Sequence, residues 1–333
     1  MPTPDRPLRI AIVGAGSPRG KDLIEVLGEG AFAGAELRLF DEDIAVGALT
    51  RAGDEPAVIA AVDEGSFEGA QLVFFAGGAP MAARHAAQAR RAGATVVDLS
   101  EDPGLAGAVA WLPALDRLVG RPAGLDGGVA RSPSAAAIVA AMMAAALDRF
   151  SPVRLALVFF RPVSERGQEG IDELERQTVS LLSFQPVPEE VFGVQVAFNL
   201  LDDYGPGNQP SLEVVRQTVV RDVAAALNGR VPSPAIQVLQ APVFFSYAFT
   251  AYAEPAARRD TEEIERALAA GGLAIEPATD PRPTNRSVAG RAQPVLGGVA
   301  RDPAIAAGCW LWGAADNVRL VATNAVAIAE ILL

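Results

Sequence analysis

Cysteine and histidine are almost absent from this sequence, whose 333 residues include one of each, Cys309 and His85. A single cysteine excludes an internal disulfide framework and a cysteine-based metal cluster. A single histidine also excludes the paired-histidine motifs of metalloenzymes, so we expect no metal site. His85 lies in ARHAAQARR, which is typical of the solvated face of a helix, and we expect it there.

Long apolar runs and positive charge are also scarce. Hydrophobic residues make up 50% of the chain, yet no apolar run is long enough to span a bilayer, and the N-terminal MPTPDRP has no apolar signal core. We therefore expect a cytoplasmic protein with no membrane partner. A net charge of −12 argues against binding to a phosphate backbone, so we expect no nucleic-acid partner either.

What the sequence does contain is an opening strand followed by a glycine-punctuated turn, in Leu8–Leu23 (LRIAIVGAGSPRGKDL). Residues 10–13 are an apolar run of the kind found in strands buried on both faces. Gly14, Gly16 and Gly20 then punctuate a turn that leads into helical spacing from Lys21. A strand, a glycine turn and a helix open a doubly wound domain, in which the helix N-terminus can hold a phosphate.

The first third of the chain continues with alternating strands and helices. Strands are expected at 35–40, 72–76 and 94–99, with a helix at 81–92, and this order predicts a parallel sheet covered by helices. Asp41, Glu42 and Asp43 directly follow the second strand. An acid there pairs with the ribose of NAD and disfavours NADP, and the alternative is a solvated acidic loop.

The remainder of the chain has a different texture. Long alternating or apolar strands are expected at 153–160, 191–201 and 236–253, helices at 211–229, 261–270 and 316–333, and a loop at 290–302. We therefore expect an α/β protein with an N-terminal doubly wound, Rossmann-type domain, residues 1–132 and 317–333, and a mixed α+β domain, residues 133–316. Apolar runs such as LALVFF and APVFFSYAF interrupt the alternation of an outer sheet face, which predicts a homodimer through this second domain.

In this order of segments the sequence resembles the aspartate-semialdehyde dehydrogenase family over nearly its whole length. GAGSPRG resembles the family's GATGAVG turn, and ARSPSAAAI at 130–138 occupies the place of its nucleophile motif, ANPNCSTI. The strand at 236–253 resembles the one that carries the family's base histidine. The closing DNVRLVATNAVAIAEIL resembles its DNLRKGAALNAVQIAE signature, with Asp316, Asn317 and Asn324 matching.

The resemblance fails at the family's reactive groups. Registering on Pro133 puts Ala135 at the nucleophilic cysteine, with Ser132 and Ser134 in place of two asparagines, and the base histidine corresponds to Tyr247. The phosphate-binding arginine expected after Ser100 is replaced by residues 101–104 (EDPG), and the family's lysine aligns with Leu320. Alanine cannot form the thioester of the family reaction. Cys309 is flanked by apolar residues, and we expect it in the core.

Other family positions are retained or replaced. Gln177 matches the active-site glutamine, Arg216 and Arg221 are candidate substrate-binding groups, and Asp172 and Glu173 are expected to be solvated. The cofactor NAD or NADP, with NAD favoured, is expected to contact Gly14, Gly16, Ser17, Arg19, Gly20, Asp41, Gly77, Gly78 and Asn317.

Two functions remain open. One is a non-catalytic or regulatory homologue that keeps the dimer and binds a small-molecule ligand. The other is an oxidoreductase with altered chemistry, in which Tyr247 assists direct hydride transfer to or from a small aldehyde or alcohol.

Overall fold

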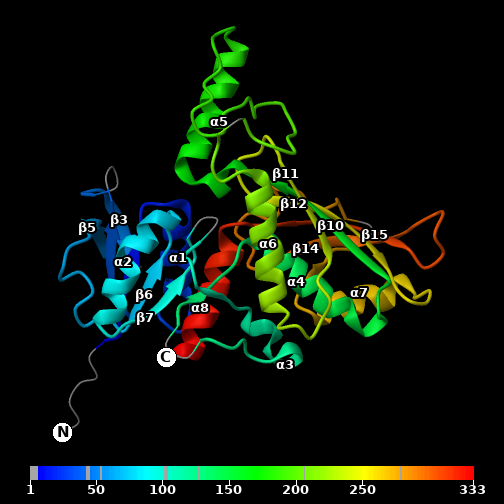
Figure 1. Ribbon diagram of the computed structural model, residues 1–333, viewed down its shortest axis with the longest axis horizontal. Helices are drawn as coiled ribbons and strands as arrows, with labels where there is room; N and C mark the ends of the chain where they lie inside the picture. Colours follow the sequence, from blue (N-terminus) through cyan, green and yellow to red (C-terminus); the bar gives the residue numbers. More distant parts are fainter. Residues whose placement is uncertain are drawn as a thin grey trace. The chain divides into compact units, whose positions relative to one another are not determined.

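The chain folds into two compact units (Figure 1). The computed structural model describes residues 7–42, 46–52, 55–100, 104–125, 128–205, 207–277 and 280–333. Unit 1 comprises Met1–Val109, Ala123–Ser132 and Val321–Leu333, and unit 2 comprises Ala110–Pro122 and Pro133–Leu320. The sequence had placed residues 110–122 in the first domain, whereas the structure assigns them to unit 2.

Unit 1 is built on a seven-stranded sheet. Its strands, in spatial order, are β5 (Ala60–Ala61), β2 (Glu36–Asp41), β1 (Arg9–Val13), β6 (Leu72–Phe75), β7 (Thr95–Asp98), β9 (Ala130–Arg131) and β8 (Val109–Ala110). The pairs from β5 through β9 are parallel. The central residues of β1 and β6 are completely buried, as expected of strands covered on both faces. The doubly wound architecture predicted from the sequence is confirmed.

Local sequence signals place the helices of unit 1. Helix α1 (Pro18–Glu29) begins after Ser17, whose Oγ accepts a hydrogen bond from the amide of Gly20 at 2.9 Å, and proline stands at its first position. Helix α2 (Ala79–Arg91) follows β6. The closing helix is α8 (Arg319–Leu332). An antiparallel pair that the sequence reading did not foresee is β3 (Leu49–Ala52) with β4 (Glu55–Val58).

Unit 2 contains a six-stranded mixed sheet. Its order is β11 (Ala235–Gln240), β10 (Arg154–Arg161), β12 (Tyr247–Glu254), β15 (Cys309–Ala315), β14 (Val295–Arg301) and β13 (Ala274–Ile275). The outer pairs β10–β11 and β13–β14 are parallel, and the inner pairs are antiparallel. The predicted mixed α+β character of the second domain is therefore confirmed.

Helices of unit 2 cover one face of this sheet. Helices α4 (Ala135–Leu147), α6 (Leu212–Ala226) and α7 (Thr261–Ala270) pack with one another and with the strands (Figure 1). Short helices η2 (Pro113–Leu115), α3 (Asp116–Val119), η3 (Asp148–Phe150) and η4 (Val163–Arg166) lie in the connections. Helix α5 (Gly167–Leu182) and residues 184–205 form a projection that we call the α5 lobe (Figure 1).

Three sequence expectations for unit 2 are wrong. Residues 191–201 are not a strand, because Gly193 and Phe198 have left-handed backbones with φ of 65° and 60°, and the segment turns. The expected strand at 236–253 is divided into β11 and β12, and residues 290–302, expected as a loop, contain β14. Runs of apolar residues alone did not reveal these backbone reversals.

None of the helices in the described part of the chain has the length and hydropathy needed to cross a bilayer.

Candidate functional site

The glycine turn of unit 1 is closely packed against the start of the loop after β6. A Cβ atom on Gly14 would lie 2.3 Å from the amide nitrogen of Gly77, and Gly14 also has a left-handed φ of 88°. A Cβ on Gly20 would lie 2.1 Å from the carbonyl oxygen of Gly14. Both positions therefore require glycine, one for the turn and one for the contact between helix and turn.

Side chains complete this turn. Ser17 Oγ donates to the carbonyl of Ala76 at 2.8 Å, and Asp41 Oδ2 accepts from the amide of Gly16 at 2.7 Å. Arg19 is buried, and its Nη1 donates to the carbonyl of Leu99 at 3.0 Å. The structure thus brings Gly16, Ser17, Arg19 and Asp41 together at the carboxyl ends of the parallel strands, where doubly wound sheets bind ligands.

The acidic segment after β2 is not a solvated loop where the structure describes it. Asp41 is buried, and Glu42 accepts hydrogen bonds from Arg84 and from His85 Nε2, the latter at 2.9 Å. Asp43 lies outside the described residues. His85 is half-buried in this contact, so the expectation of a solvated histidine is wrong.

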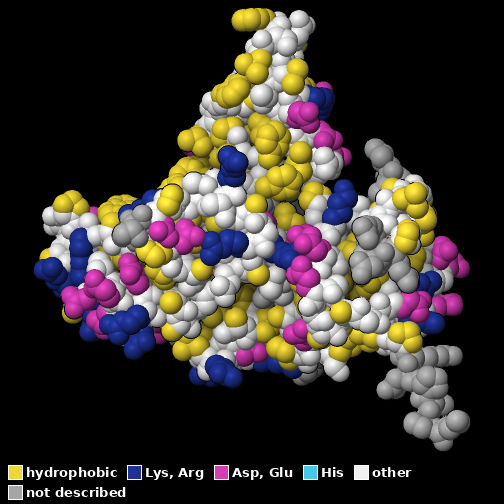
Figure 2. Space-filling model, turned by 180° about the vertical axis from the view of Figure 1, so that it is seen from behind, with side chains coloured by type: hydrophobic (Ala, Val, Ile, Leu, Met, Phe, Trp, Pro, Cys, Tyr) yellow, Lys and Arg dark blue, Asp and Glu magenta, His cyan; other side chains and the backbone are white. Residues whose placement is uncertain are grey.

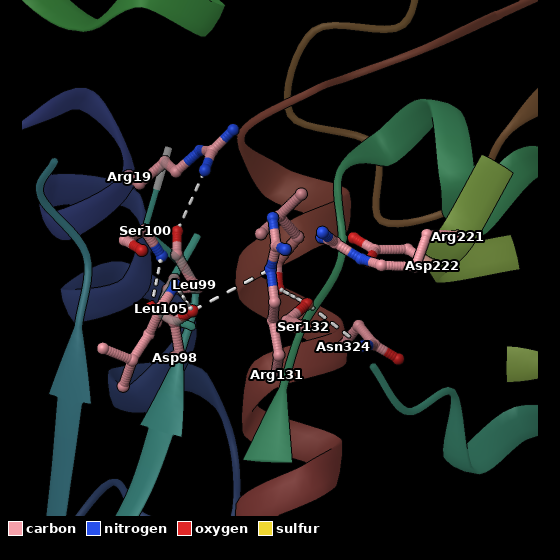
Figure 3. A network of polar contacts seen from close by, with 11 residues as sticks. Arg19, Asp98, Leu99, Ser100, Leu105, Arg131, Ser132, Arg221, Asp222 and Asn324 are labelled. Atoms are coloured by element: carbon pink, nitrogen blue, oxygen red, sulfur yellow. Dashed lines mark hydrogen bonds and ion pairs between the residues drawn. The ribbon is translucent and has the colours of Figure 1, made fainter. Parts of the chain in front are cut away.

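A second polar group of unit 1 surrounds Asp98 at the end of β7 (Figure 3). The Asp98 carboxylate accepts from the amides of Ser100 and Leu105 at 3.0 and 2.8 Å, and its Oδ2 lies 3.8 Å from Arg131 Nε. Ser100 Oγ is buried without a hydrogen-bond partner in the described structure. Residues 101–103, where the sequence lacks the family's arginine, lie outside the described residues.

Arg131 is a functional candidate that the sequence reading missed. It is buried, and a Cβ on Gly104 would lie 2.3 Å from its Cζ, so the guanidinium fills the space beside Gly104. The available signal was a charged residue within an otherwise apolar stretch, which the structure shows to end the short strand β9. Next to it, Ser132 Oγ donates to the carbonyl of Val321 at 2.8 Å and accepts from Asn324 Nδ2 at 3.0 Å (Figure 3).

In unit 2, the residue that the sequence resemblance places at the family's nucleophile position, Ala135, is the first residue of α4. Ala135 is completely buried there, directly after Ser134 at the N-cap. Ser134 makes no capping hydrogen bond, and its buried Oγ has no partner among the described residues. A helix N-terminus favours negative charge, so this end of α4 could stabilise an anion although it lacks a nucleophile.

Cys309 is the single cysteine of the sequence. It lies in the central strand β15, is completely buried, and its Sγ is 3.3 Å from the carbonyl oxygen of Ala253. Burial raises the pKa of the Cys309 thiol, which keeps it protonated. The core environment expected for this residue is confirmed.

Tyr247, at the family's base position, starts β12 and is completely buried with an edge-to-face contact to Phe159. The preceding Ser246 has a left-handed φ of 66°. Its amide donates to Asn317 Oδ1 at 2.8 Å, and its carbonyl accepts from Asn285. A left-handed backbone at serine is strained, and these side-chain bonds hold it in place.

Asn317 takes part in a hydrogen-bond network within unit 2. Its Nδ2 donates to Glu165 Oε1 at 2.8 Å and to Ser164 Oγ at 3.1 Å, while Oδ1 accepts from Ser246. These bonds use both halves of the amide. The expected contact of Asn317 with a dinucleotide stays a prediction.

A buried network at the end of β10 was not recognised from the sequence. Arg161 donates to Tyr204 Oη at 3.1 Å and to the carbonyl of Glu165 at 3.0 Å, and Tyr204 donates to Gln240 Oε1 at 2.7 Å. Arg161, Glu165 and Gln240 are all buried. The signal in the sequence was an arginine that terminates the apolar strand LALVFFR.

Gln177 and Glu173 hold the α5 lobe together. Gln177 Oε1 accepts from the amides of Val196 and Ala197 at 2.8 and 3.0 Å, and Glu173 accepts from those of Val191 and Phe192 at 2.6 and 3.0 Å. Both side chains are fully buried, so the expectation that Glu173 is solvated is wrong. The contacts of Gln177 lie within the α5 lobe, where its Nε2 also donates to the carbonyls of Pro188 and Val194.

The two arginines considered as substrate-binding groups are paired with acids on their own helix. Arg216 makes a bidentate contact with Glu213, and Arg221 contacts Asp222 Oδ1 at 3.0 Å. Leu320 is buried.

Glu173 predicts a specific pH dependence. Burial raises its pKa above the ordinary value of 4.5, against the opposing effect of the bonds from Val191 and Phe192. The folded protein therefore holds this proton more tightly than the unfolded chain. The stability that Glu173 contributes is complete below pH 4.5 and is lost as the pH rises through the pKa of the folded state.

Replacing Glu173 by glutamine should remove this dependence. Urea unfolding of the parent and of Glu173→Gln between pH 4 and pH 7, roughly the stable range of such proteins, should show the parent losing stability relative to the variant as pH rises. Glu175→Gln, on the exposed side of the same helix, is the matched control. A stability difference between parent and Glu173→Gln that is constant across this range would contradict the raised pKa.

Comparisons with known proteins agree over the whole chain. The family model described as semialdehyde dehydrogenase, NAD binding domain, matches residues 9–116, and the one described as semialdehyde dehydrogenase, dimerisation domain, matches residues 144–320. A USG-1 protein homolog of Pseudomonas aeruginosa is 30% identical over 333 residues, covering 98% of each chain. Aspartate-semialdehyde dehydrogenase 2 of Vibrio cholerae is 27% identical, covering 97% of each.

Solved structures give the same picture. That of a probable aspartate-semialdehyde dehydrogenase from Pseudomonas aeruginosa aligns with a TM-score of 0.81 at 30% identity over 98% of both chains. Aspartate semialdehyde dehydrogenase II from Vibrio cholerae aligns with a TM-score of 0.84 at 26% identity over 98% of both chains. On the two family models and these relatives, the chain belongs to the aspartate-semialdehyde dehydrogenase family.

Proposed function

We propose that this protein binds a nicotinamide dinucleotide in unit 1, NAD in preference to NADP, and forms a homodimer through unit 2. We further propose that it does not catalyse the phosphorylating oxidation of aspartate semialdehyde. One observation carries the second statement. The first residue of α4, at the family's nucleophile position, is Ala135, whereas the chain's cysteine is a buried strand residue.

The other groups near the family's reactive positions support the same conclusion. A phenol with a pKa near ~10 is a poor general base at neutral pH, and Tyr247 is fully buried. Arg131 supplies a guanidinium beside Gly104, but the Asp98 carboxylate lies 3.8 Å from its Nε and offsets its charge. Arg216 and Arg221 are paired with acids. On this proposal the chain lacks the family's nucleophile and its base, and its candidate anion-binding arginines are each paired with an acid.

The residues of the glycine turn fit a dinucleotide. Gly14 permits a tight turn, and the N-terminus of α1 follows it. The carboxylate of Asp41, the last residue of β2, faces the turn, and an acid at this place hydrogen-bonds to a ribose hydroxyl in doubly wound domains. The Gly16 amide, however, already donates to Asp41, so a ligand that uses this amide must compete with the carboxylate. A bound nicotinamide would supply hydride chemistry.

A titration tests both parts of the proposal. Calorimetry with NAD, NADP and their reduced forms should show binding, with NAD tighter because Asp41 repels a 2′-phosphate. Mixtures with small aldehydes or alcohols should leave the nicotinamide absorbance unchanged. A steady absorbance change would support the alternative, an oxidoreductase that needs no covalent intermediate, and would contradict the loss of catalysis.

The outer face of the unit 2 sheet supports the proposed dimer. Side chains there alternate with buried ones, and several of them are apolar or aromatic, as in the cross-strand neighbours Tyr252 and Trp310, whose rings are 5.0 Å apart. Trp310 is 44% exposed. The α5 lobe adds Leu182 and Phe184, the latter 96% exposed, and Figure 2 shows hydrophobic side chains gathered over this lobe. Exposed apolar surface of this extent is typical of an association site.

Light scattering at micromolar concentration should give twice the 34.5 kDa mass of the chain. Trp310→Arg should weaken the dimer by about thirtyfold or more, because a charge at an apolar interface must be desolvated. Leu49→Arg, at an exposed apolar position in unit 1, is the control and should leave the mass unchanged. A parent mass near that of one chain would rule out the dimer.

A further inference from the structure

Glu42, Arg84 and His85 form an ionic cluster in unit 1 that the proposed function does not use. Glu42 directly follows β2, while Arg84 and His85 lie in the first half of α2. Arg84 Nε donates to Glu42 Oε1 at 3.1 Å and its Nη2 to Oε2, so the guanidinium makes a two-pronged contact. His85 Nε2 lies 2.9 Å from the same Oε1.

The cluster is partly shielded from water. The side chains of Glu42 and His85 are 24% and 18% exposed. The hydrogen bond from Arg84 is the main cause that lowers the pKa of Glu42, with a further contribution from His85, so the carboxylate stays ionised. The Arg84 guanidinium and the His85 Nε2 atom therefore both contact the Glu42 carboxylate, an anion that the chain itself supplies.

The position of this anion is informative. In doubly wound domains the residue at the end of the second strand meets the adenosine ribose, where an acid selects NAD and a nearby arginine accommodates the 2′-phosphate of NADP. Here both devices are present next to each other: Asp41 bonds to the glycine turn, and Arg84 is held by Glu42. A planar guanidinium binds phosphate and carboxylate with the same two-pronged geometry.

We propose that Glu42 is an internal substitute for the 2′-phosphate of NADP, occupying an anion site formed by Arg84 and His85, and that together with Asp41 it sets the preference for NAD. This inference rests on the proposed binding of a dinucleotide to unit 1. Glu42 acts in two ways: it neutralises the cation that a 2′-phosphate needs, and it adds a second carboxylate beside Asp41. Removing its charge weakens the contacts of Arg84 and His85 with Glu42, so that an external phosphate can compete for them.

The test compares Glu42→Gln with the parent by calorimetry, using NAD, NADP, ADP and adenosine 2′,5′-bisphosphate. The last two probes isolate the adenosine end of the site. In Glu42→Gln the affinity for NADP and for the bisphosphate should rise by about tenfold, the effect of one charge-assisted phosphate contact. The affinity for NAD and ADP should change by less than about threefold, since these ligands lack the 2′-phosphate.

Two variants control the result. Glu36→Gln removes another carboxylate of β2, which pairs with Arg9 at 3.0 Å, and should leave the NADP-to-NAD ratio unchanged. Adding Arg84→Ala to Glu42→Gln should abolish the gain for NADP.

Each failure is distinguishable. If the parent and Glu42→Gln both bind NAD and have the same ratio of NADP affinity to NAD affinity, the role of Glu42 is overturned while the proposed function stands. If neither protein binds any of the four ligands, nucleotide binding itself is overturned, and this inference with it.

Discussion

The purified protein, supplied with aspartate semialdehyde, inorganic phosphate and either NAD or NADP, is expected to form no reduced nicotinamide. Ala135 cannot attack the aldehyde, so no thioester can be formed for phosphate to cleave. Cys309 cannot replace it, because its thiol is buried within β15 and burial raises its pKa. A family member that carries the catalytic cysteine, assayed in parallel, provides the positive control.

Restoring the thiol alone should not restore turnover. In Ala135→Cys the new side chain would stand at the N-terminus of α4, which lowers the pKa of a cysteine. The variant would still lack a general base, because Tyr247 takes the place of the family's histidine. It would also lack an uncompensated cation for phosphate, because the Arg131 guanidinium would still face Asp98. Turnover by the parent near the ordinary range of about 1–10³ s⁻¹ would show that the register through Pro133 is wrong.

The largest effect on stability is expected at Gly20. Gly20→Ala would place a methyl group 2.1 Å from the Gly14 carbonyl oxygen and 2.8 Å from Ala15 Cα, both backbone atoms of the turn. The turn and α1 would have to separate, at a cost of about 3 kcal/mol or more in the free energy of unfolding. Urea unfolding measures this change, and a ligand that binds the turn should bind Gly20→Ala more weakly as well.

Gly28 provides the matched control on the same helix. A Cβ there meets nothing within 4 Å, so Gly28→Ala tests helix propensity alone. It should raise the unfolding free energy by up to about 1 kcal/mol. If Gly20→Ala were as well tolerated as Gly28→Ala, the close approach of helix and turn would be refuted.

Local patterns in the sequence were sufficient for most of unit 1. The apolar run 10–13 is part of β1, and the helix expected from Lys21 is α1, which begins three residues earlier, at Pro18. In unit 2, Ser211 caps α6, its Oγ accepting from the Val214 amide at 3.3 Å. These elements depend on residues within a few positions of one another, which is why the sequence alone predicted them.

Apolar runs in unit 2 were less informative. Residues 191–201 alternate like a strand, but Phe198 adopts a left-handed backbone. Backbone amides of the segment donate hydrogen bonds to the side chains of Gln177 and Glu173. Each of these hydrogen bonds joins residues 19 positions apart, so the spacing of apolar residues does not reveal them. Hydrophobic periodicity shows which residues avoid water, and it does not show where the backbone reverses.

The sequence by itself determined the fold class and the family resemblance, since each is a property of residue type and order. Only the tertiary structure decided what the polar side chains do. Glu42 meets His85 across 43 positions, and Asn317 meets Glu165 across 152. The physical reason is that buried polar groups must find partners wherever the fold places them, and no local pattern encodes a partner so distant along the chain.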